Sequence, residues 1–118
     1  MTLPALALAG LALCGPRVER VVATGTASWY DEDTETASGE RFDPDALTCA
    51  TPAGVVPMGA WCTVVCRATD RMVRVRRTDT GPAHRLHRVI DLTPAAFRRL
   101  GLRTSAGGPG VCQVEVRR

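Results

Sequence analysis

The chain has 118 residues, of which 4% are aromatic, and a formal net charge of +3. This length suits one domain with a single core, which must be built from Val, Leu, Ala and Cys. The charge is small and divided between an acidic stretch at 31–45 and a later arginine-rich stretch. That division, together with the shortage of stacking aromatic rings, argues against nucleic acid as a partner.

Residues 1–14 are almost entirely apolar. The run is too short to span a membrane comfortably and is typical of a signal-peptide core. Cys14 follows Leu-Ala-Leu, as in a lipoprotein cleavage box, and is a candidate lipid anchor. A buried N-terminal segment or a mis-assigned start is the alternative. We expect 1–20 to be a leader or N-terminal extension of an exported protein, and 21–118 to be its folded domain.

Four cysteines besides Cys14 form an even set in a short chain: Cys49, Cys62, Cys66 and Cys112. Two disulfides in an oxidising compartment are the preferred interpretation. Zinc is the alternative, but only Cys62 and Cys66 have a spacing close to that of zinc ligands. We expect no metal or cofactor. Of the three possible pairings we favour Cys66–Cys112 with Cys49–Cys62, while the other two stay open.

The predicted elements begin with a strand at 21–30, in which Gly25 marks a bulge or bend. A polar, acidic loop follows at 31–45, and its Ser-Gly and Asp-Pro pairs are turn signals. A short apolar piece then occupies 46–50, before a loop rich in Pro and Gly.

Two strands at 60–67 and 71–78 are separated by a three-residue turn and form a predicted hairpin. In the second strand the valines alternate with arginines. The valines are expected to face the core, while Arg74 and Arg76 face outward.

A tight turn is predicted at 79–82, because glycine permits unusual backbone angles and proline fixes them. A brief strand at 88–92 leads to the clearest helix, which Thr93 caps, a proline starts and Gly101 ends. A closing strand is predicted at 111–116. Short strands with one helix indicate a small β-barrel.

Six stretches are similar, in order, to motifs of one known family. They are 25–30 (GTASWY), 36–43 (TASGERFD), 46–48 (ALT), 57–59 (PMG), 77–82 (RTDTGP) and 89–93 (VIDLT). Together they resemble the rare lipoprotein A family, which is related to expansins and barwin-like proteins. The resemblance implies a mainly β fold, a six-stranded double-psi β-barrel with one short helix, over nearly the whole of 21–118.

Characterised members of that family are lytic transglycosylases, which cut peptidoglycan and leave a 1,6-anhydro sugar. This chemistry needs a carboxyl group that gives a proton to the leaving oxygen and then accepts the proton of the C6 hydroxyl. Asp79, in the tight turn, is the candidate, and Glu40 or Asp91 would assist it. The alternatives are an Asx-type turn former at Asp79, a solvated charge at Glu40 and a strand-end hydrogen-bonding residue at Asp91.

The resemblance also places Ser28 and Tyr30 on the face of the first strand that lines the substrate groove, with Thr51 beside them. Thr51 stands where the family has a histidine that contributes to activity. A glycan-binding module without catalysis, like expansins, and a virion-associated structural barrel therefore remain alternatives to the enzyme. The expected partner is the glycan strand of peptidoglycan, bound by a monomer.

Overall fold

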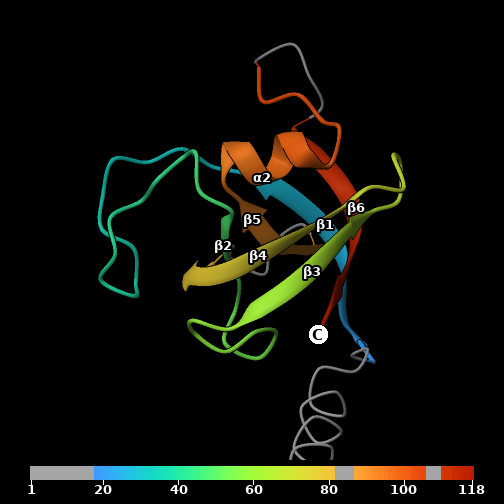
Figure 1. The fold of residues 1–118 in the computed structure, drawn as a ribbon, viewed down its shortest axis with the longest axis horizontal. Helices are drawn as coiled ribbons and strands as arrows, with labels where there is room; N and C mark the ends of the chain where they lie inside the picture. Colours follow the sequence, from blue (N-terminus) through green and yellow to red (C-terminus); the bar gives the residue numbers. More distant parts are fainter. Residues whose placement is uncertain (1–17, 82–86, 106–109) are drawn as a thin grey trace, which may run out of the picture.

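The structure is a computed structural model that describes residues 18–81, 87–105 and 110–118. Every segment predicted as a strand forms one, and the apolar piece at 46–50 supplies another (Figure 1). The strands are β1 (Val21–Trp29), β2 (Thr48–Ala50), β3 (Trp61–Cys66), β4 (Met72–Asp79), β5 (Arg88–Leu92) and β6 (Val111–Arg117). The predicted helix is α2 (Pro94–Arg99), between β5 and β6.

The strands form one closed barrel in the order β1-β5-β2-β4-β3-β6. Strand β1 pairs in parallel with β5, and β2 pairs in parallel with β4, while the other neighbours are antiparallel. Closure pairs every strand on both sides, so that the barrel has no exposed sheet edge. The predicted mainly β barrel of six strands is confirmed.

Small and branched side chains fill the barrel, as the shortage of aromatic residues requires. Val73 and Val75 are 5% and 0% exposed, so the predicted alternation along β4 is confirmed. Helix α2 lies across one end of the barrel and buries Phe97 (Figure 1). The Thr93 side chain accepts a hydrogen bond from the backbone N–H of Ala96, which is the predicted N-cap.

Gly25 is required by a close approach between β1 and the start of β5. Its φ is +156°, and a Cβ added there would lie 2.6 Å from the carbonyl oxygen of His87. The pairing of β1 with β5 shifts register between Thr26 and Ala27, one residue beyond Gly25. The sequence therefore located this irregularity to within a residue.

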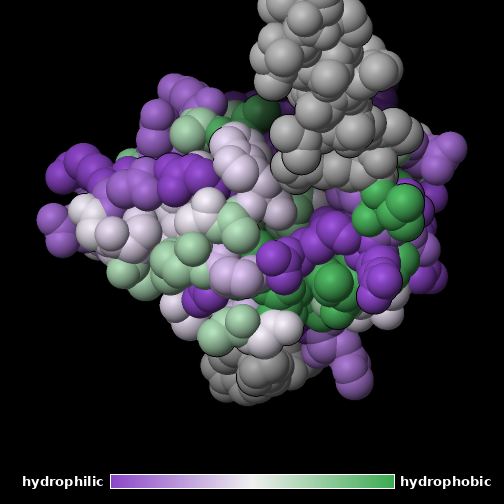
Figure 2. Space-filling model, turned by 60° about the horizontal axis from the view of Figure 1, so that its bottom comes forward, coloured by the Kyte–Doolittle hydropathy of each residue, from purple (hydrophilic) through white to green (hydrophobic). Residues whose placement is uncertain are grey.

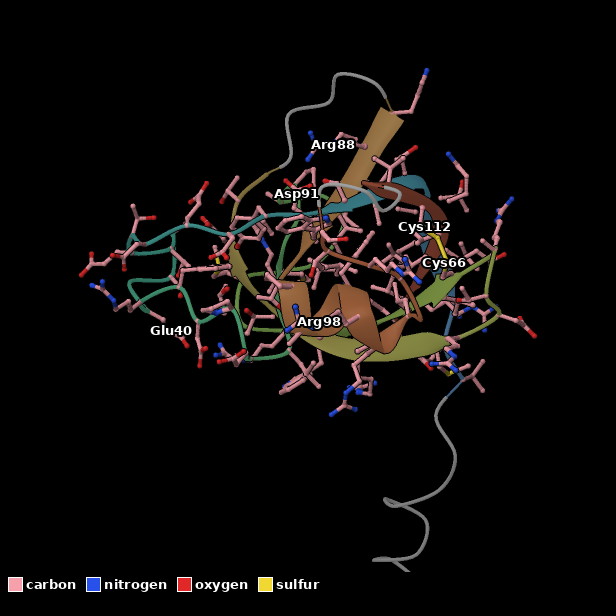
Figure 3. The ribbon with its side chains drawn as sticks, turned by 90° about the horizontal axis from the view of Figure 1, so that it is seen from above. Glu40, Cys66, Arg88, Asp91, Arg98 and Cys112 are labelled. Atoms are coloured by element: carbon pink, nitrogen blue, oxygen red, sulfur yellow. A yellow bond between two sulfur atoms is a disulfide. The ribbon has the colours of Figure 1, made fainter. Side chains whose placement is uncertain are left out.

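The cysteine prediction is half confirmed. Cys66 and Cys112 form a disulfide that joins β3 to β6 (Figure 3), which removes two of the four candidate zinc ligands. The predicted Cys49–Cys62 disulfide is wrong, because both residues are free, buried thiols. Strand β4 lies between β2 and β3, so the backbones of Cys49 and Cys62 are not neighbours in the sheet. The thiols do share a hydrogen bond, which together with burial raises the pKa of Cys49.

The leader prediction lies largely, and Cys14 entirely, outside the described residues. Backbone pairing of the barrel extends to Arg20, whose N–H and C=O bond to Arg118. Among the described helices, none has the length and apolar character that crossing a bilayer requires.

Candidate active site

The predicted carboxylates Asp79 and Asp91 lie in one row that crosses four strands. Ser28 on β1 pairs with Asp91 on β5, Asp91 pairs with Ala50 on β2, and Ala50 pairs with Asp79 on β4. Only one residue of β2, Ala50, therefore separates the two acids in the row. The structure brings together side chains that are twelve positions apart in the sequence.

Tyr30 lies just beyond the end of β1, beside both acids. Its backbone N–H donates to the carbonyl of Leu92 at 3.0 Å, and its ring packs against Phe42 with centroids 4.7 Å apart. Its hydroxyl is buried and has no hydrogen-bond partner among the described residues. Burial, followed by the negative charges of Asp79 and others including Asp91, raises the pKa of Tyr30 well above its usual value. The phenol therefore stays protonated and can donate a hydrogen bond to a ligand.

Asp79 holds its turn through one carboxylate oxygen. Its Oδ1 accepts from the backbone N–H of Thr80 at 2.9 Å and from that of Ala37 at 3.0 Å. The bond from Thr80 is the turn-forming contact that is the alternative to a catalytic role for Asp79. The bond from Ala37 attaches the acidic loop to this turn. Within the described residues no group bonds to Oδ2. One oxygen is thus fixed by the backbone, and none of the described residues occupies the other.

Arg77 supports this turn from inside the barrel, a role the sequence analysis missed. Its side chain is buried, and the residue is only 4% exposed. Its guanidinium donates to the carbonyls of Asp79 at 3.0 Å and Val56 at 2.9 Å, and to the hydroxyl of Thr80 at 3.0 Å. The sequence did contain a signal that Arg77 faces inward. Val73 and Val75 face the core, and the same alternation, continued by two residues, places Arg77 on the inner face.

Asp91 is held by Ser28 and by Arg88, which lies near it in Figure 3. The Ser28 hydroxyl donates to Oδ1 of Asp91, and the Arg88 guanidinium donates to both residues. Ser28 was predicted to contact substrate, but it is only 6% exposed and its hydroxyl is occupied by Asp91 and Arg88. It is therefore a positioning residue. Arg88 lies three residues before Asp91 and was also missed.

Thr51 does not take the expected place in the groove. It is fully buried, its hydroxyl donates to the Pro52 carbonyl at 3.1 Å, and its N–H donates to the Asp79 carbonyl at 3.3 Å. Full burial leaves Thr51 no exposed surface for the predicted substrate contact. A threonine is small enough to fold into the backbone here, whereas the family histidine would need more space.

Glu40 lies in a separate pocket, away from Asp91 (Figure 3). This pocket, the Glu40 pocket, has a volume of about 210 Å³ and includes Thr48, Arg76 and Thr78 in its lining. Arg76 donates to both oxygens of Glu40, at 2.9 and 2.6 Å. These hydrogen bonds lower the pKa of Glu40, so its carboxylate is ionised near neutral pH. In this arrangement it is poorly suited to donate a proton.

A closed barrel of six strands with two parallel strand pairs is the arrangement of a double-psi β-barrel. The family model described as "Lytic transglycolase" matches residues 22–116, and the chain belongs to this family. The resemblance seen in the sequence is confirmed.

Curated relatives carry the name endolytic peptidoglycan transglycosylase RlpA. That of Neisseria meningitidis serogroup A is 35% identical over 88 residues, which cover 72% of this chain and 36% of the relative. That of Yersinia pestis is 42% identical over 81 residues, covering 66% and 22%. The chain thus spans well under half the length of these relatives.

Two solved structures share the fold alone. The Streptomyces papain inhibitor has a TM-score of 0.57 at 22% identity, with 86% of this chain and 93% of that chain covered. The expansin of Clavibacter michiganensis has a TM-score of 0.59 at 17% identity, with 84% and 49% covered.

Proposed function

We propose that this protein is a lytic transglycosylase that cleaves the glycan strands of peptidoglycan, with Asp79 as its general acid and base. The observation that carries the proposal is the pairing of Asp79 and Asp91 on either side of Ala50, next to a protonated phenol that no described residue hydrogen-bonds. Family membership and the names of the curated relatives support the same substrate.

The reaction uses the two oxygens of Asp79 differently. Oδ1 keeps its two backbone hydrogen bonds, while Oδ2 carries the proton that moves to the glycosidic oxygen as the C1–O bond breaks. The C6 hydroxyl of the same sugar then attacks C1 and returns its proton to Oδ2. The product is a 1,6-anhydro sugar, no water is consumed, and Asp79 ends protonated as it began.

The neighbouring groups supply charge and orientation. Asp91, paired with Arg88, is the second carboxylate and faces the positive charge that develops at C1. The Tyr30 hydroxyl donates to a sugar oxygen, because the described residues leave it without a partner. Glu40 acts as an ionised carboxylate in its own pocket, where it binds a sugar further along the strand.

A glycan-binding module without catalysis is the second candidate. The burial of Thr51, where the family has a histidine, favours it. Such a module would use the same groove and leave the glycan intact.

The test compares wild type with Asp79→Asn and, as a matched control, Asp70→Asn. Asp70 lies in the turn between β3 and β4 at φ +58°, a conformation that asparagine adopts readily. Purified peptidoglycan is incubated with each protein, and soluble anhydro-muropeptides are measured by mass spectrometry. We expect Asp79→Asn to lower their release by about 100-fold or more and Asp70→Asn to leave it unchanged. Equal release from all three proteins, or no release from wild type, would exclude catalysis by Asp79 and favour the glycan-binding module.

We also propose that the protein is exported to the cell envelope and attached there through a lipid on Cys14, acting as a monomer. The Cys66–Cys112 disulfide supports an oxidising compartment. Metabolic labelling with a fatty acid should mark the wild-type protein and leave Cys14→Ala unlabelled. Equal labelling of the two would exclude this anchor.

A further inference from the structure

A second hollow lies on the outer face of the barrel, beside Trp61. This Trp61 hollow has a volume of about 280 Å³ and is lined by Val18, Glu19, Trp61, Arg74 and Arg118. Trp61 is 48% exposed, and the Arg74 guanidinium lies over its ring, 5.9 Å from the centroid. Figure 2 shows the bottom of the molecule, where strongly hydrophilic side chains lie directly beside hydrophobic ones.

The chemistry of the Trp61 hollow suits an acidic saccharide. An exposed indole ring offers a flat apolar surface against which the apolar face of a sugar can pack. Arg74 and Arg118 present guanidinium groups, which bind carboxylates with two parallel hydrogen bonds. Neither arginine forms a salt bridge within the described part of the chain, and Glu19 is the one acid in the lining. The side chains that line the hollow thus carry two positive charges and one negative charge.

Strand register places the Trp61 hollow next to the Glu40 pocket. Arg76 on β4 pairs with Trp61 on one side and with Thr48 on the other. Thr48 and Arg76 line the Glu40 pocket, while Trp61 and Arg74 line the hollow. The two depressions thus adjoin across Arg76 on one face of the sheet.

Strand β4 then leads from the Trp61 hollow to the candidate proton donor. Arg74 and Arg76 are two residues apart on the same face, or about 7 Å at the rise of a strand. From Arg74 to Asp79 the distance along the strand is about 16 Å. This path is longer than a single sugar ring and suits an oligosaccharide.

We propose that the Trp61 hollow is a distal subsite, which binds a carboxylate-bearing sugar of the same glycan strand that reaches Asp79. Trp61 packs against the sugar ring, and Arg74 and Arg118 bind the carboxylate. The inference rests on the proposed function for the identity of the polymer, but it uses residues that take no part in the cleavage chemistry.

Binding can be measured without cleavage in an Asp79→Asn background, which keeps an acceptor oxygen for the two backbone N–H groups. The probes are peptidoglycan glycan strands freed of their peptides, which carry carboxylates, and neutral chitin oligosaccharides of equal length. Added to that background, Trp61→Ala should weaken binding of both probes by about tenfold, as loss of a stacking contact predicts. Arg74→Gln should weaken binding of the acidic probe alone by a similar factor.

Met72→Ala is the matched control, because Met72 is 61% exposed on the outer face of β4 and lines neither depression. Equal affinity of Trp61→Ala and Met72→Ala for both probes would overturn the subsite, as would an equal loss for both probes in Arg74→Gln. Circular dichroism checks that each variant is folded. If Trp61→Ala does not fold, the binding data for Arg74→Gln alone test the subsite. Failure of the proposed function is separate, since wild type would then release no anhydro products while the Trp61-dependent binding persisted.

Discussion

Arg76 and Arg77 are neighbours on β4, yet they serve two regions that differ in burial. Arg76 points outward and binds the exposed Glu40 in the acidic loop. Arg77 points inward, is 4% exposed, and holds the Asp79 turn through two backbone carbonyls and one hydroxyl. One carboxylate is thus held by a surface ion pair, and the other sits on a turn fixed from within the core.

The difference bears on the role of each acid. A surface ion pair keeps Glu40 ionised and contributes little to folding, because water screens and solvates both partners. The Asp79 turn is secured by a buried cation, and its removal would take one hydrogen bond from each of three acceptors. A proton donor needs a fixed position, and of these two regions only the Asp79 turn provides it through the core.

The largest effect is expected from Arg77→Met, which removes three hydrogen bonds but keeps an unbranched side chain. The acceptors at Val56, Asp79 and Thr80 would lose the buried guanidinium. We expect the free energy of unfolding to fall by about 3 kcal/mol or more. Urea unfolding followed by circular dichroism measures this, and glycan cleavage should fall with it as the Asp79 turn loosens.

Arg74→Met is the control for this substitution, because Arg74 lies on the same strand but faces outward. Its free energy of unfolding should change by less than about 1 kcal/mol. If the two variants unfold at the same urea concentration, the Asp79 turn does not depend on Arg77, and the contrast between the two regions disappears.

The sequence predicted the barrel well, because its strands, the Thr93 cap and Gly25 are local signals. It also proposed Asp79 and Asp91 as catalytic candidates, because their neighbours fit a family motif, and the structure places these two acids in one row. It missed Arg77 and Arg88, since an arginine that bonds to backbone carbonyls or across to another strand has no motif of its own. Their partners, among them Val56 for Arg77 and Ser28 for Arg88, are known only once the strands are placed.

The unexpected surroundings of Ser28, Thr51 and Cys49 have one feature in common. Each residue has a side chain able to act at a site, and the sequence does not show whether another group of the protein already occupies it. Ser28 bonds to Asp91 and Thr51 to Pro52, while the backbone of Cys49 is separated from that of Cys62 by β4. Such occupancy depends on pairing across the barrel.

A smaller effect should come from the network of Ser28, Arg88 and Asp91. The side chains of Arg88 and Asp91 are 33% and 13% exposed, so the exposure of this network lies between that of Glu40 and that of Arg77. In a double-mutant cycle of Ser28→Ala and Arg88→Met, we expect a coupling energy of about 1 kcal/mol, because both residues bond to the same carboxylate oxygen. Additive unfolding energies would show that the two contacts act independently.

The smallest effect on stability is expected from Glu40→Gln, which tests the surface region alone. Hydrogen bonds from Arg76 lower the pKa of Glu40 in the folded protein from its ordinary value of 4.5. The pairing therefore stabilises the fold above pH 4.5 and is lost as the pH falls through the lower folded value. Midpoints of thermal unfolding for wild type and Glu40→Gln should differ slightly near neutral pH and converge in acid.

Cleavage by Glu40→Gln completes this test, because the same substitution removes any proton that Glu40 could donate. We expect a loss of about tenfold, smaller than that of Asp79→Asn, since an ionised Glu40 binds the strand and transfers no proton. Arg76→Gln serves as the control, because it breaks the same ion pair and keeps the carboxyl group. A loss in Glu40→Gln equal to that of Asp79→Asn, with cleavage retained in Arg76→Gln, would transfer the role of proton donor to Glu40.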